Sequence, residues 1–306
     1  MNATEAQAVV NQGIQQMLDD PDQWRQWAST MARFHRYSPG NVLLIMSQRP
    51  DATQVAGYHA WQSLGRQVNR GEHGIAILAP IIRRQQEAEQ SATDSPKPAQ
   101  PSGLVGFKAA TVFDVSQTSG RDLQLPAPKV LDGQSLAELL GSLTAVVGVP
   151  VLLAESDTLG GANGVWRPSE GTITVASDRS PDQQTKTLIH EWAHKVGVPD
   201  TAAAMDRHRG SEEITAETTA FVLAQRMGID TSEYSIPYVG HWAEGDPKKV
   251  MALTQSVSQR VQEMSSTLEA QAQRDPVLAQ ALGMPSPQAQ AQSQAQVQED
   301  ALELEA

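Results

Sequence analysis

The sequence of 306 residues contains no cysteine. Disulfides and thiolate ligands are therefore excluded, and any metal site must be built from histidine and carboxylate side chains. No hydrophobic run is long enough to span a bilayer, and the N-terminus lacks the basic and apolar regions of a signal peptide. We therefore expect a cytoplasmic protein with no membrane partner.

Positive charge is scarce but concentrated. The chain has 23 Lys and Arg against 35 Asp and Glu, a formal net charge of −12, which argues against nucleic-acid binding by the whole surface. Residues 25–84, however, contain eight arginines, no lysine and only two acids, Asp51 and Glu72. This segment carries a net charge of +6, and arginine suits both phosphate contacts and base stacking.

The most informative stretch is His190-Glu191-Trp192-Ala193-His194. Ser180 and Pro181 predict the start of a helix, and Gly197 predicts its end. Because residues four apart share one helix face, His190 and His194 would reach one metal ion. We expect zinc (Zn²⁺), although other first-row ions accept the same ligands, and we assign Glu191 as the catalytic acid or base.

A second predicted helix, from Ser211 to about Met227, supplies carboxylates for a third metal ligand. Glu213 and Glu217 lie on one of its faces. We favour Glu213 as the ligand and Glu217 as the acceptor that holds a histidine ring, with the reverse assignment open. Glu212 is expected to point into solvent. Tyr238 or His241, which follow this helix, are candidates to stabilise an oxyanion.

The order of predicted elements indicates an α+β protein of two domains. Helices are predicted at 5–20 and after Asp20, and strands at 74–82 and 107–113 flank a Gln- and Pro-rich insertion at 85–103 that we expect to be flexible. We place the first domain at 1–125 and the second at 130–272. Residues 273–306 form a Gln/Ala-rich acidic segment that we predict to be a disordered tail.

Several motifs of the first half occur together in a known family. The stretches Phe34–Asn41, Trp61–Arg66 and Gly71–Ile75, followed by Val112–Thr118, resemble the N-terminal single-stranded-DNA-binding domain of the ArdC family of antirestriction proteins. The second half, with His190–His194 and Glu212–Glu217, resembles the zinc metallopeptidase domain of that family, related to the ImmA/IrrE peptidases. The resemblance implies an ssDNA-binding domain followed by a zincin-like metallopeptidase domain.

This resemblance implies a zinc peptidase that binds single-stranded DNA, protects incoming mobile-element DNA from restriction and cuts an unknown protein substrate. Two alternatives stay open: a non-catalytic protein that coats single strands and holds a structural zinc ion, and an ImmA-like regulatory protease that cleaves a repressor. Seven residues are candidates for contacts with the bases and phosphates. They are Arg36, Tyr37, Asn41, Tyr58, Trp61, Arg66 and Arg70.

Overall fold

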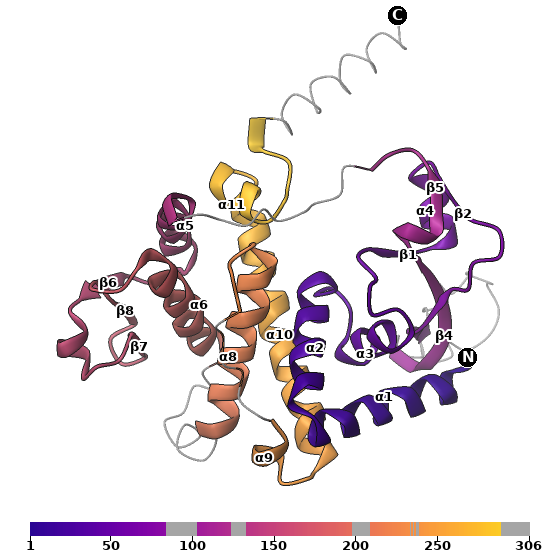
Figure 1. Ribbon diagram of the computed structural model, residues 1–306, viewed down its shortest axis with the longest axis horizontal. Helices are drawn as coiled ribbons and strands as arrows, with labels where there is room; N and C mark the ends of the chain where they lie inside the picture. The colour runs from indigo at the N-terminus through magenta and orange to yellow at the C-terminus, as the bar shows by residue number, and fades with distance from the viewer. Residues whose placement is uncertain are drawn as a thin grey trace, which may run out of the picture. The chain divides into compact units, whose positions relative to one another are not determined.

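The computed structural model describes residues 1–83, 103–123, 133–197, 209–232, 234, 236 and 239–288. The described residues form two compact units (Figure 1). Unit 1 consists of Met1–Gly13 and Gly40–Arg121, and unit 2 consists of Ile14–Pro39 and the chain from Asp122 onward. The division between the units therefore falls within the first helix, α1 (Ala3–Asp19).

Unit 1 combines short helices with two small antiparallel sheets. Its helices are α3 (Pro39–Gln48) and α4 (Tyr58–Ser63). One sheet has the strand order β1-β4-β3 and the other pairs β2 with β5. The strands are β1 (Val55–Gly57), β2 (Arg66–Val68), β3 (Ile75–Arg83), β4 (Gly103–Asp114) and β5 (Thr118–Gly120).

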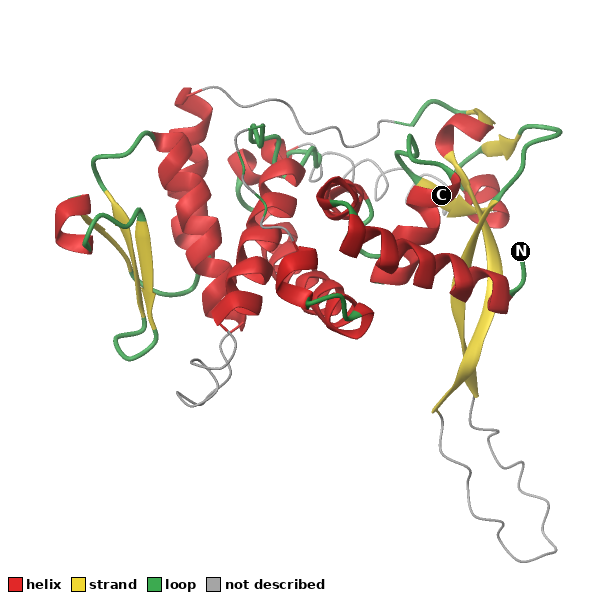
Figure 2. Ribbon diagram, turned by 60° about the horizontal axis from the view of Figure 1, so that its bottom comes forward, coloured by secondary structure: helices red, strands yellow, loops and turns green. Residues whose placement is uncertain are grey.

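The predicted strands at 74–82 and 107–113 are confirmed as the antiparallel pair β3 and β4. Figure 2 shows them as a long two-stranded ribbon. The side-chain amide of Asn41 pairs with both backbone groups of Leu78, and that of Gln48 pairs with both backbone groups of Ala76. These amides satisfy the outer edge of β3 at alternate residues. The insertion predicted at 85–103 lies outside the described residues, apart from Gly103.

Unit 2 consists of helices and one three-stranded sheet, in which β6 runs parallel to β8 and β7 lies antiparallel to β8 at the edge. The strands are β6 (Val151–Ala154), β7 (Gly164–Arg167) and β8 (Thr172–Ala176). The helices are α2 (Pro21–Arg33), α5 (Gly133–Val146), α6 (Pro181–Gly197), α8 (Arg209–Arg226), α9 (Val239–Ala243), α10 (Pro247–Ala272) and α11 (Pro276–Ala281).

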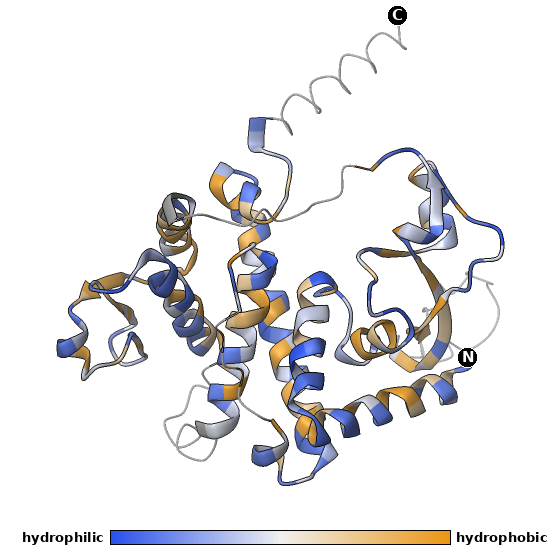
Figure 3. Cartoon of the chain, viewed as in Figure 1, coloured by the Kyte–Doolittle hydropathy of each residue, from blue (hydrophilic) through white to orange (hydrophobic). Residues whose placement is uncertain are grey.

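The core of unit 2 lies between α5, α6, α8 and α10. Each helix contributes one apolar face, and Figure 3 shows orange and blue residues alternating along α10. Leu188 and Ile189 of α6 are fully buried against Leu223 of α8 and Leu139 of α5. The two histidines lie on another side of α6, next to Glu213 near the N-terminal end of α8.

Helix α2 packs with unit 2 although it lies near the start of the chain. The indole N–H of Trp24 donates to the hydroxyl of Thr218 on α8 at 3.1 Å, and both side chains are buried. The guanidinium of Arg25 donates to the carbonyls of Thr231 and Tyr234. Residues 14–39 thus group with unit 2, although the range 1–125 was expected to form the first domain, and the later division between the units follows Arg121.

The prediction of a disordered tail from residue 273 is wrong for its first part. Asp275 caps helix α11 by accepting hydrogen bonds from the N–H groups of Val277 and Leu278. Leu278 and Leu282 are buried in the core of unit 2. The Gln/Ala composition conceals these few apolar anchors, and residues 289–306 lie outside the described part of the chain.

Within the described ranges, no helix is both long and apolar enough to cross a membrane.

Candidate metal centre

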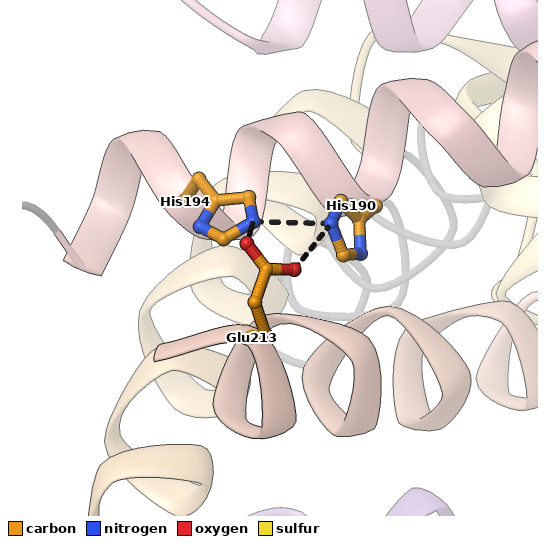
Figure 4. Close-up of side chains that lie close together, drawn as sticks. All are labelled: His190, His194 and Glu213. Carbon is orange, nitrogen blue, oxygen red and sulfur yellow. Dashed lines mark hydrogen bonds and ion pairs between the residues drawn. The ribbon is translucent and has the colours of Figure 1, made fainter. Parts of the chain in front are cut away.

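Helix α6 sets the geometry of the site. The hydroxyl of Ser180 accepts from the N–H of Gln183, and Pro181 occupies the first turn, so the helix begins where the sequence predicts. His190 and His194 lie on one face, with their ring centroids 4.7 Å apart. Figure 4 shows both rings turned toward Glu213, which extends from α8.

Three side chains present donor atoms to a common point. His190 Nε2 and His194 Nε2 are 3.0 Å apart, and the carboxylate of Glu213 lies 3.6 Å from the first nitrogen and 3.4 Å from the second. Two ligands held tetrahedrally at about 2.05 Å from a zinc ion would lie about 3.3 Å apart. The donor set His190, His194 and Glu213 therefore fits a divalent metal ion, and every pair of donor atoms lies within 4.8 Å.

Further carboxylates surround the two histidine rings. Glu217 Oε2 lies 2.9 Å from His190 Nδ1, although the two atoms are not aligned as a hydrogen bond. Burial lowers the pKa of His190, but the carboxylates of Glu213, Glu217 and Glu191 outweigh it and raise that pKa to about 10. The same two histidines lower the pKa of Glu213. Without a metal, the cluster thus favours positive rings beside negative carboxylates.

The expectation that Glu212 points into solvent is wrong. Its carboxylate lies 3.3 Å from His194 Nδ1 and accepts two hydrogen bonds from Arg260, at 2.8 and 2.6 Å. Arg260 is buried on α10 and also donates to the carbonyl of Ala193. Burial would raise the pKa of Glu212, but the hydrogen bonds with His194 and Arg260 lower it. Glu212 therefore orients His194 so that Nε2 faces the other donors.

Glu191 lies beside the donor cluster on the buried side of α6. Its Oε2 accepts a hydrogen bond of 2.7 Å from the backbone N–H of Trp166 on the edge strand β7. A Cβ added at Gly164 would lie 3.2 Å from Glu191 Cγ and 2.4 Å from Thr187 Cγ2, so the glycine allows β7 to approach the helix. Burial raises the pKa of Glu191, whereas the nearby histidines oppose that shift.

A cleft of about 450 Å³ opens beside His190, Glu191 and Glu217. Tyr234 lines this cleft, held by the hydrogen bond from Arg25 to its carbonyl. Its hydroxyl is buried, and no group in the described part of the chain is hydrogen-bonded to it. Burial raises the pKa of Tyr234, with Glu217 and Asp182 adding to the shift.

The two oxyanion candidates named from the sequence do not line the cleft. Tyr238 lies outside the described residues, and His241 is an exposed residue of α9 that is absent from the cleft wall. Tyr234 occupies the wall instead. No sequence pattern identifies Tyr234 as a residue of the site. Arg260 could have been identified, because an arginine next to Val257 and Val261 on a buried helix face requires a buried partner for its charge.

Comparison with known proteins gives independent information on the N-terminal part. Residues 3–113 match the family model of the N-terminal domain of anti-restriction factor ArdC. That match covers α1 to α3 and nearly all of the β1-β4-β3 sheet. The N-terminal part of the chain is ArdC-like.

The curated relatives of the chain are distant in sequence. An uncharacterized protein of Bacillus anthracis, pXO2-81, is 25% identical over 311 residues, covering 86% of this chain and 51% of that protein. This chain thus spans about half the length of that relative. The uncharacterized protein y4eC of Sinorhizobium fredii is 23% identical over 263 residues, covering 79% of this chain and 81% of that protein.

Two solved structures of the antirestriction ArdC protein from plasmid R388 are also similar. The metal-free crystal structure is 19% identical, with a TM-score of 0.48, and covers 76% of this chain and 85% of that one. The Mn(II)-bound structure is 17% identical, with a TM-score of 0.46, and covers 76% of this chain and 84% of that one.

Three of the proposed DNA-contact residues have structural roles in unit 1, and the assignments of the buried Trp61 and Asn41 are wrong. Trp61 is 2% exposed and donates to the carbonyl of Phe113, which leaves no ring face for a base. Asn41 is buried and caps the edge of β3. The guanidinium of Arg66 donates to Thr118 and to the carbonyl of Arg121. These side chains hold the fold of unit 1.

The other four DNA candidates remain partly or fully accessible. Arg36 belongs to unit 2, where it donates to Glu269 at 2.8 Å, and Tyr37 is half-buried. Tyr58 is 39% exposed, with its hydroxyl accepting from Gln67, and Arg70 is exposed. Of the candidates in unit 1, Tyr58 and Arg70 are exposed and Arg66 is half-buried.

Proposed function

We propose that this ArdC-like protein binds single-stranded DNA through unit 1 and carries a metal-dependent peptidase-type site in unit 2, and that the two together protect incoming DNA from restriction. The observation that carries the proposal is the convergence of His190, His194 and Glu213 beside the buried carboxylate of Glu191. The match of residues 3–113 to the ArdC N-terminal domain supports the DNA-binding part.

The metal site would be formed by His190, His194 and Glu213, with zinc or another divalent ion as the occupant. When bound, such an ion supplies Lewis-acid chemistry at a carbonyl group. Glu212 accepts the Nδ1–H of His194, so the Nε2 lone pair of that ring stays available. Arg260 keeps Glu212 in place through its paired hydrogen bonds.

Glu191 is the proposed general base and acid. The N–H of Trp166 fixes one carboxylate oxygen, which leaves the other free to take up a proton and later to deliver it to a leaving amine. The upward shift of its pKa by burial brings this carboxyl closer to neutral pH, where proton transfer in both directions is efficient. Tyr234 lines the cleft, and its hydroxyl has no hydrogen-bond partner within the described ranges, so Tyr234 is the proposed donor to a substrate carbonyl oxygen.

The test compares the wild-type protein with Glu191→Gln, which leaves all three proposed ligands intact. Glu138→Gln, an exposed glutamate on α5, is the matched control. We expect Glu191→Gln to bind metal and single-stranded DNA normally, to lose cleavage of a proteome-derived peptide library followed by mass spectrometry, and to lose protection of incoming DNA in cells. Glu138→Gln should behave as wild type.

Full protection of incoming DNA by Glu191→Gln would instead support a protein that acts by coating single strands. Loss of protection together with cleavage of one cellular repressor by the wild type would support a regulatory protease. His190→Ala should lose stoichiometric metal, measured by elemental analysis after gel filtration; a full metal complement in that variant would refute the ligand assignment.

A further inference from the structure

The ribbon of β3 and β4 has an exposed apolar face. Pro80 lies opposite Phe107 in the ladder, and Ile82 lies opposite Leu104, with an irregularity in register after Ile81. Directly opposed residues, and residues two apart in a strand, point to the same face. All four are exposed, Ile82 by 64%, Leu104 by 62% and Phe107 by 54%. We call these four residues the ribbon patch.

The ribbon patch has no role in the core of unit 1. Apolar residues that are left exposed together, rather than singly, mark surfaces that contact a ligand or partner. The neighbouring edge of β3 is unsuited to pairing with another strand, because Asn41 and Gln48 occupy its backbone groups and Pro80 has no N–H to offer. The face of the ribbon, rather than the β3 edge, is therefore available for binding.

The charges on the ribbon select the kind of ligand. Along β3 and β4 the sequence contains Arg83 and Lys108, and its one acid is Asp114. The carboxylate of Asp114 is buried and accepts hydrogen bonds from Thr53, Gln54 and Ser116. Lys108 follows Phe107 and so starts from the opposite face of the ribbon, but β1 pairs only with Val112–Asp114, so Lys108 lies at an open edge of β4 that its long side chain can reach round. It is exposed and has no ion-pair partner among the described residues. An apolar face beside an uncompensated cation favours a polyanion with apolar faces.

We propose that the ribbon patch is a base-stacking surface for single-stranded DNA, with Phe107 stacking on a base and Lys108 contacting the adjacent phosphate. Single strands are bound by this combination of an aromatic face and a cation, with little dependence on sequence. Phe107 is the most exposed aromatic residue described in unit 1, compared with 39% for Tyr58 and 2% for Trp61. The inference rests on the proposed function and names the surface that performs its DNA-binding part.

The experiment measures binding of a fluorescent oligo(dT) to the full-length protein by anisotropy over a series of salt concentrations. Phe107→Ala should weaken binding roughly five- to a hundredfold, because a stacking contact is lost, and should leave the salt dependence unchanged. Lys108→Gln should lower the slope of log K against log salt by about 0.7, the value expected for one phosphate contact on a single strand.

Leu153→Ala is the matched control, since Leu153 is 65% exposed on β6 of unit 2 and its loss removes a similar apolar side chain. It should bind as wild type. Because Phe107 and Leu153 are both exposed, the melting temperature of each variant should stay within a few degrees of the wild-type value.

Three outcomes would overturn the inference. If wild type binds oligo(dT) and Phe107→Ala binds equally well, the DNA-binding proposal stands but its surface lies elsewhere. If wild type binds no oligo(dT) at any salt concentration, the DNA-binding proposal fails as well. If Phe107→Ala changes the oligomeric state in sedimentation while DNA affinity is unaltered, the patch contacts another protein chain.

Discussion

Replacing Glu212 by glutamine tests how the site positions its second histidine. The change is nearly isosteric and leaves His190, His194 and Glu213 untouched, but it removes the negative charge that faces Arg260 and His194. The amide keeps one oxygen to accept from His194 Nδ1, so the ring should be oriented less firmly rather than released. Losing an outer carboxylate of this kind typically weakens metal binding 10- to 100-fold, or about 1.4 to 2.7 kcal/mol.

The assay is competition for zinc with a chromophoric chelator at pH 7. Glu244→Gln is the control, because Glu244 is an exposed glutamate of unit 2 that pairs with Lys249. A second measurement separates positioning from folding: the rise in melting temperature on adding zinc should shrink in Glu212→Gln, whatever the change in the metal-free protein. Zinc affinity equal to that of wild type would refute the positioning role of Glu212.

Three further perturbations have calculable outcomes. Burial and the nearby Arg226 lower the pKa of His35 from 6.5 to about 4, so the folded protein should lose about 3 kcal/mol of stability as the pH falls from 6.5 to 4. In urea unfolding, the free energy of unfolding of His35→Gln should depend less on pH over this range, and a dependence equal to that of wild type would contradict the prediction. Gly164→Ala should cost about 1–3 kcal/mol through its clash with Thr187, whereas Gly141→Ala, with open space around it, should not lower the melting temperature. Leu278→Ala should cost about 2–5 kcal/mol, and a melting temperature equal to wild type would mean that α11 is not packed.

Local signals explain which parts of the structure the sequence predicts. The start of α6 follows from Ser180 and Pro181, and the four-residue spacing of His190 and His194 fixes their common face. The pairing of β3 with β4 follows from two apolar strands on either side of a polar insertion. Each of these features depends on residues close together in the chain or on a repeating pattern.

Features that depend on distant residues were missed. Glu212 and Arg260 are 48 residues apart, and only the packing of α10 against α6 and α8 brings them together. In the sequence, Trp61 and Tyr58 look equally able to stack on a base, but the fold buries Trp61, which donates to the carbonyl of Phe113, and leaves Tyr58 exposed. Strand β7, which supplies the N–H for Glu191, is four residues long and shows no alternating pattern.

The packing of α2 has a consequence for how the protein can be dissected and synthesised. Trp24 meets Thr218 across 194 residues of chain, so the apolar stripe of α2 leaves the ribosome long before α8 exists to cover it. A fragment that starts at Asp122 would lack α2 altogether and would expose the face of α8 that Trp24 covers. The C-terminal unit should therefore be soluble only when residues 14–39 are supplied, either in the same chain or as a separate peptide added in trans.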